Sequence, residues 1–170
     1  MADLTDQPET RLERFAGAAA RPLSELLDCP QHTGTLLTGA VQNLEFEAGQ
    51  IVFHQDDPTK GLYVVASGEF ARKTQRLQMR VTLGLARPGD LLELAAALGD
   101  AHHTYSLSAV SRGSLLLLPI ESLHRAFESY PPLRMRLLEE LAREVSRAYV
   151  TCCQTRVTPA RRHSGSSAQA

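Results

Sequence analysis

Short apolar runs separated by turn residues fill the middle of the chain. The runs are Ile51–Phe53, Leu62–Ala66, Phe70–Lys73, Met79–Leu85, Ser106–Ala109 and Leu115–Pro119. Clusters of glycine, proline and aspartate stand between them. Many short strands with turns at about 8–12-residue spacing are typical of a β-sandwich or barrel. An even number of such strands with one helical insert favours a jelly roll.

The pattern becomes helical on both sides of this region. Before it, Pro22–Leu27 resembles a short helix with proline in its first turn, and Leu36–Val41 is a second short helical candidate. After it, Glu121–Tyr130 predicts a short helix that Pro131-Pro132 ends. Leu133 to about Cys153 then predicts a long helix with no internal glycine or proline. The predicted fold class is therefore mainly β with flanking helices (α+β).

An apolar seam follows the long helix. Its positions are spaced by 3, 4, 3 and 4 residues: Leu138, Leu141, Val145, Ala148 and Cys152. This is the a/d spacing of a coiled coil, so the seam predicts a homodimer interface. The alternative is a helix packed on its own domain, with Leu133, Leu137 and Tyr149 as a second face for the sheet.

Length and composition predict one folded domain with flanking segments. Residues 1–21 read as a flexible N-terminal arm, residues 22–153 as the folded domain including the long helix, and residues 154–170, rich in polar residues, as a disordered tail. Hydrophobic residues make up 43% of the chain, which is enough for a core.

The net charge and the cysteine content limit the partners and the cell compartment that the sequence predicts. The formal net charge is −1, so nothing favours nucleic acid or an anionic membrane as a bulk electrostatic partner. No apolar run approaches the ~20 residues that span a bilayer, and no signal peptide is visible. Cys29, Cys152 and Cys153 do not form a disulfide framework. These features predict a cytoplasmic protein without a membrane segment.

The segment from Gly89 to Val110 carries the candidate chemistry. It reads as a strand end, a turn, one short helix, a loop and a new strand. That layout places free backbone amides at a helix start beside an acid, Glu93. Such amides bind phosphate without many dedicated side chains.

Motifs in a fixed order point to a family. They are Ala48-Gly49, Asp57-Pro58, Leu62–Val65, Ser67-Gly68-Glu69 and Pro88-Gly89-Asp90. From roughly Leu23 to Val150 the chain resembles the cyclic nucleotide-binding domain of Crp/Fnr-type bacterial regulators. The resemblance implies a β jelly roll, a short helix within a phosphate-binding cassette, and a long C-terminal helix that dimerises. It also implies a non-enzymatic regulatory domain that senses a cyclic AMP-like or cyclic GMP-like ligand and signals through the dimer helix.

The resemblance assigns site residues to the cassette. In the family the cassette begins Gly-Glu and ends Arg-Ser or Arg-Thr; here Leu92-Glu93 and His103-Thr104 stand at these places. By family role, Glu93 accepts a hydrogen bond from the ribose hydroxyl and Thr104 donates one to the phosphate. The candidate ligand-binding residues are Leu92, Glu93, Leu94, Ala95, Ala96, His103 and Thr104.

Leu92 and His103 depart from the family pattern. Glycine lets a ligand approach the backbone and adopts positive φ, whereas leucine does neither readily. An arginine fork donates two parallel charge-assisted bonds to a phosphate, and a histidine donates one at most. Losing one such bond implies about 10- to 150-fold weaker binding. His103 is thus a surface loop residue beside His102, a substitute phosphate donor or part of a repurposed pocket.

Functions other than sensing find less support in the sequence. A cupin-type metalloenzyme needs several converging ligands, which the histidine spacing does not supply, and no catalytic signature is present, so neither an enzyme nor a metal site is predicted. A haem sensor with His54 or His103 as axial ligand is one alternative. Another is a degenerate fold that has lost nucleotide binding and binds a protein partner. No helix-turn-helix pattern follows Val150, so direct DNA binding is not expected; the ligand and the regulated partner stay open.

Overall fold

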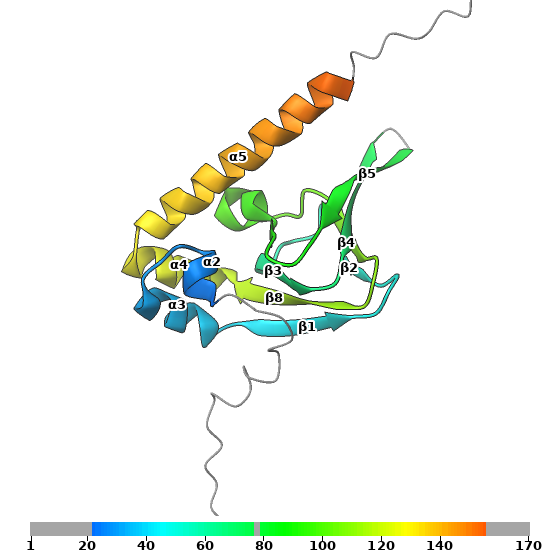
Figure 1. Cartoon of the computed structure of the whole chain (residues 1–170). Coiled ribbons are helices and arrows are strands. Elements are labelled where there is room, and N and C mark those ends of the chain that lie inside the picture. Colours follow the sequence, from blue (N-terminus) through cyan, green and yellow to red (C-terminus); the bar gives the residue numbers. More distant parts are fainter. Residues whose placement is uncertain (1–21, 77–78, 156–170) are drawn as a thin grey trace, which may run out of the picture.

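Two four-stranded antiparallel sheets form the domain (Figure 1). The computed structural model describes residues 22–76 and 79–155. The predicted arm, and the predicted tail from residue 156, lie outside the described residues. The sheets have the strand orders β1-β8-β3-β6 and β2-β7-β4-β5. The predicted jelly roll with flanking helices is confirmed.

The strands follow the predicted apolar runs closely. Their bounds are β1 Gln42–Phe46, β2 Ile51–Phe53, β3 Gly61–Ser67, β4 Phe70–Arg76, β5 Met79–Ala86, β6 Leu91–Leu92, β7 Ser106–Ala109 and β8 Gly113–Pro119. Two of these strands, β1 and β6, were not predicted. The first is mostly polar and exposed at the edge of its sheet, and the second has only two residues, so neither carries a clear apolar run.

Helices flank the sheets at both ends of the described chain. Their bounds are α2 Leu23–Leu26, α3 Gln31–Thr38, the π-helical segment η2 Ala96–Asp100, α4 Ile120–Ser129 and α5 Pro132–Thr155. The predicted helix at Leu36–Val41 was placed wrongly: the helix begins directly after Pro30 and ends at Thr38. Proline is favoured at the start of a helix, and Pro30 directly precedes α3, so Pro30 is a start signal for that helix. None of the helices among residues 22–155 that the structure describes has the length and apolar character to cross a membrane.

Two apolar clusters fill the core. One lies between the sheets around Phe70, Leu107 and Leu115, all fully buried. The other joins the helices to the outer face of the β8 sheet. Leu94 and Ala97 of the cassette segment belong to this second cluster together with the start of α5. The cassette and the start of the helix that leaves the domain therefore share one apolar cluster.

The long helix α5 has a packed beginning and an exposed end. Leu133 and Leu137 are buried in the helical cluster and Leu141 packs against its edge, whereas Val145 is 59% exposed. Figure 1 shows the later part of α5, in orange, extending beyond the sheets. Tyr149 is 71% exposed, so the expectation that it packs on the sheet is wrong.

The predicted dimer seam lies mostly on this exposed part. Leu138 is half-buried and Ala148 is exposed, and Val145 lies between them on the open length of the helix. The side chain of Cys152 lies outside the described residues, although its backbone continues α5. The described chain leaves Val145 and Ala148 uncovered, so the dimer interface remains a prediction.

Candidate ligand-binding cassette

Glu93 adopts an unusual backbone conformation at the start of the cassette. It follows β6 directly and has φ of 67°, in the left-handed region that L-residues rarely occupy. Leu92 before it is 1% exposed and packs between the sheets. The turn at Glu93 directs its carboxylate into the domain, where the residue is 3% exposed.

The carboxylate of Glu93 is held by the far end of the cassette. The Thr104 backbone N–H donates to Glu93 Oε2 at 3.2 Å, and the Thr104 hydroxyl donates to Oε1 at 3.4 Å. His103 Nδ1 lies 3.3 Å from Oε2, an ion-pair distance without hydrogen-bond geometry. The structure thus brings together Glu93, His103 and Thr104, three of the predicted site residues.

The other predicted residues supply backbone rather than side chains. Leu94 and Ala96 are each 2% exposed and Ala95 is half-buried, so their side chains face protein. They begin the cassette helix, whose last turn closes with Ala101 N–H donating to Ala96 O at 3.0 Å. The first amides of a helix have no acceptor within it, so they are the groups that an anion would bind.

His103 is not a surface histidine, and that interpretation of the sequence is wrong. Its side chain is 2% exposed, and its ring stacks on Phe53 with centroids 3.7 Å apart and planes 6° apart. Its backbone exchanges hydrogen bonds with the 54–57 loop, since His103 N–H donates to Asp57 O at 2.8 Å. In this extended pairing successive side chains point to opposite sides, so His102 is exposed and His103 is buried.

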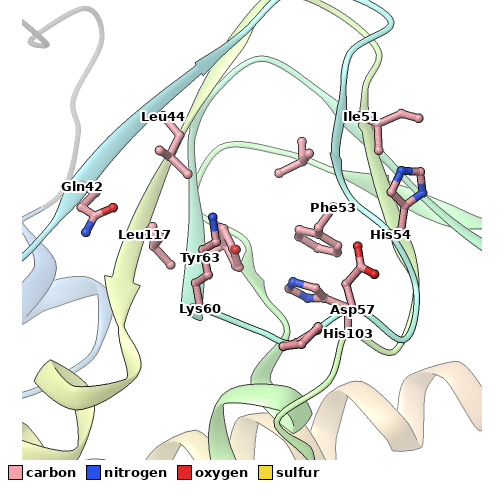
Figure 2. Close-up of a pocket in the computed structure, with 12 residues that line it drawn as sticks. Gln42, Leu44, Ile51, Phe53, His54, Asp57, Lys60, Tyr63, His103 and Leu117 are labelled. Atoms are coloured by element: carbon pink, nitrogen blue, oxygen red, sulfur yellow. The ribbon is translucent and has the colours of Figure 1, made fainter.

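A cavity of about 310 Å³ opens at the edge between β1 and β2, with His103 in its wall (Figure 2). Its lining residues are Gln42, Leu44, Ile51, Val52, Phe53, His54, Asp57, Pro58, Lys60, Tyr63, His103 and Leu117. Figure 2 shows Lys60 and Tyr63 on one side of the view and Asp57 and His54 on the other. Because His103 also faces Glu93, its ring separates this cavity from the cassette carboxylate.

Arg72 lies beside the cassette and is not among the residues that the sequence predicts for the site. Its Nη1 donates to Glu144 Oε1 of α5 at 3.2 Å, and its Nη2 lies 3.9 Å from Asp90 Oδ2. The guanidinium also lies over the ring of Tyr105, 5.9 Å from its centroid. A signal was present in the sequence, because Arg72 is two residues beyond the buried Phe70 and side chains two apart in a strand share a face.

Burial and carboxylates set the electrostatics of the cassette. Burial and the charge of Glu93 raise the pKa of Tyr63 to about 12, and the same two causes, in that order, raise the pKa of Tyr105. Both phenols therefore stay neutral donors at physiological pH. Burial also raises the pKa of Glu144 above its ordinary value of 4.5, while Arg72 opposes the rise.

A metal site requires an arrangement in which at least three ligating side chains converge. Within residues 22–76 and 79–155, no three histidine, cysteine, aspartate or glutamate side chains converge as metal ligands.

A jelly roll with a helix-containing cassette and a long C-terminal helix defines the class of cyclic nucleotide-binding domains. The model of that family, described as cyclic nucleotide-binding domain, matches residues 43–130, more than half of the chain. The chain belongs to this family, and the resemblance to Crp/Fnr-type regulators is confirmed.

Individual members of this family and solved structures resemble the chain. The HTH-type transcriptional regulator Cmr of Mycobacterium tuberculosis is 25% identical over 147 residues, which are 85% of this chain and 60% of that protein. The catabolite activator protein of Thermus thermophilus is 26% identical with a TM-score of 0.68, over 79% of this chain and 63% of that one. The regulatory domain of Toxoplasma gondii PKA, crystallised with cAMP, is 21% identical with a TM-score of 0.59, over 74% and 46% of the two chains. This chain therefore spans less than two thirds of these longer proteins.

Proposed function

We propose that this domain is a cytoplasmic, non-catalytic sensor of a small anionic ligand, a cyclic nucleotide or a close analogue. Glu93 would accept a hydrogen bond from the ligand's sugar hydroxyl. The amides of Leu94–Ala96 and the Thr104 hydroxyl would bind its phosphate. The single observation that carries the proposal is the buried Glu93 carboxylate paired with Thr104 at the start of the cassette helix.

The relatives support the chemistry of the ligand. The Toxoplasma gondii domain was crystallised with cAMP, and the matching family model is that of cyclic nucleotide-binding domains. The Mycobacterium tuberculosis relative is a transcriptional regulator of greater length.

Signalling would pass through α5. The cassette residues Leu94 and Ala97 share an apolar cluster with Leu133 and Leu137 of α5. A ligand changes the helix only if it binds two arrangements of α5 with different affinity. The shared cluster anchors the first turns of α5 beside the cassette, so the later turns are the part whose arrangement a ligand would change.

The exposed part of α5 supports a homodimer. Val145 and Val150 are 59% and 51% exposed, which is costly for apolar side chains on a lone helix. A second copy packed along Leu138, Leu141, Val145 and Ala148 would cover this surface. Sedimentation equilibrium of the purified chain is expected to show dimers, and a concentration-independent monomer would contradict the interface.

Thermal unfolding with and without ligand tests the sensing proposal. Millimolar cyclic AMP or cyclic GMP is expected to raise Tm in a concentration-dependent way, because binding to the folded state alone adds about 2.7 kcal/mol at a hundredfold excess over Kd. Adenosine at the same concentration is the control, since it lacks the phosphate. An unchanged Tm with both nucleotides would contradict the proposal.

One alternative keeps a specific observation in its favour. Glu93 is already engaged by Thr104, and one nitrogen of Arg72 is engaged by Glu144. A degenerate fold that binds a protein partner would look the same, and the absent Tm shift would favour it. The haem alternative has less support from the structure. His54 and His103 line the same cavity, but the His103 ring is stacked on Phe53.

A further inference from the structure

Arg72 has donor capacity that the domain does not use. Its Nε is buried and has no hydrogen-bond partner, while Nη1 donates to Glu144. A guanidinium carries five N–H donors in a planar fork that matches a phosphate or carboxylate. The side chain is 20% exposed, so an incoming anion can reach it.

His103, by contrast, is committed elsewhere. Its ring is stacked on Phe53 and its Nδ1 faces Glu93, so it does not extend as a free donor. The strand pairing places Arg72 opposite Leu107 of β7, two residues from Tyr105, and Tyr105 responds to the charges of both Arg72 and Glu93. Arg72 therefore belongs to the same polar cluster as the cassette acid.

The Glu144 carboxylate forms an ion pair with Arg72, as the anionic group of a ligand would. It comes from α5, 72 residues further along the chain, and its side chain is 39% exposed. Burial disfavours its charged form more than Arg72 favours it. An ion pair with such a desolvation cost adds little stability, so exchanging Glu144 for another anion costs little.

The charges around Arg72 also favour an anion that replaces the Glu144 carboxylate over an anion that binds beside it. Asp90 and Glu144 already face Arg72, and Glu93 lies in the same cluster. A further anion beside all three carboxylates would be repelled, whereas an anion that takes the place of Glu144 leaves the number of charges unchanged.

We propose that Arg72 binds the anionic group of the ligand and that Glu144 of α5 occupies Arg72 in the empty domain. The inference rests on the proposed function and names the regulation of the same site. Ligand binding releases Glu144, and the contact between β4 and α5 is lost. Leu133 and Leu137 stay buried in the core, so the change is confined to the part of α5 beyond them.

Titration of the full chain and four variants tests this exchange. The variants are Glu144→Gln, Arg72→Gln, Arg72→Lys and the control Glu69→Gln. Glu69 pairs with Arg87 at the same 3.2 Å, but on the surface. Calorimetry with cyclic AMP and with inorganic phosphate gives affinities, and the Arg72 Nε–H resonance reports whether the anion reaches that side chain.

The exchange predicts a distinct pattern of affinities. Glu144→Gln removes the competing charge and is expected to bind about ten-fold tighter or more, while Arg72→Gln binds about ten-fold weaker or more. Arg72→Lys keeps the positive charge but lacks the planar guanidinium, so its affinity is expected to lie between those of wild type and Arg72→Gln. Glu69→Gln stays within about two-fold of wild type.

Each outcome separates the inference from the proposed function. If cyclic AMP binds the wild type but the Arg72 variants or Glu144→Gln bind equally well, the exchange is wrong and sensing stands. If phosphate binds Glu144→Gln through Arg72 while no form binds a cyclic nucleotide, the exchange stands and the nucleotide proposal fails. If neither anion binds any form, both are wrong.

Discussion

Replacing Gly61 by alanine is expected to destabilise the domain by about 3 kcal/mol or more. Gly61 begins β3 with φ of 154°, opposite Pro119 of β8. A Cβ at this position would overlap the Leu118 carbonyl and lie 3.1 Å from the Ile120 nitrogen. Both neighbours are backbone, so neither can move aside without breaking the sheet or the start of α4. Urea unfolding of Gly61→Ala against wild type measures the loss.

Gly99→Ala is the matched control for this substitution. Gly99 lies in the cassette helix, and a Cβ there would meet nothing within 4 Å. Its expected change in unfolding free energy is within about 1 kcal/mol, because alanine is also the better helix former. Equal stability of Gly61→Ala and wild type would show that the β3–β8 contact is not as close as the structure has it.

Replacing Glu93 by alanine is expected to cost about 3 kcal/mol of folding stability and to abolish nucleotide binding. The substitution removes the acceptor of the part-buried hydrogen bond from Thr104 N–H and leaves the buried His103 Nδ1 without its carboxylate. A hydrogen bond to a charged acceptor contributes about 1.5–3 kcal/mol, and the lost volume of the buried Glu93 side chain adds a cavity term. Urea unfolding and calorimetry with cyclic AMP measure the two effects.

Glu93→Gln separates the two roles of this side chain. Its amide oxygen can still accept from Thr104, so the expected stability loss is only about 1 kcal/mol. The charge that strengthens the bond to a sugar hydroxyl is gone, so nucleotide binding should still weaken about ten-fold. Wild-type affinity in both variants would remove Glu93 from the ligand site.

Local patterns were enough to predict the sheets. Alternation and turn residues marked six of the strands, since each had an apolar run of its own. The edge strand β1 is largely exposed and β6 is two residues long, so their existence depends on pairing with β8 and β3. Such pairing partners lie far apart in sequence and leave no local signal.

The candidate site was predicted unevenly for the same reason. Glu93 and Thr104 followed from the cassette motif, and their contact is present in the structure. The surface interpretation of His103 was wrong because the burial of its ring depends on stacking against Phe53, 50 residues earlier. Arg72 gained its role only when α5 brought Glu144 to it. Contacts of this kind are tertiary and cannot be read from spacing alone.

Hydrogen exchange along α5, with and without saturating cyclic AMP, tests the central claim most directly. Protection of the amides in residues 139–150 is expected to fall on binding, while α4 and the strands around Phe70 keep or gain protection. The reason is that the ligand takes Arg72 from Glu144 and so removes a contact that holds this part of the helix. Unchanged protection of residues 139–150 at millimolar cyclic AMP would contradict a sensor that acts through α5.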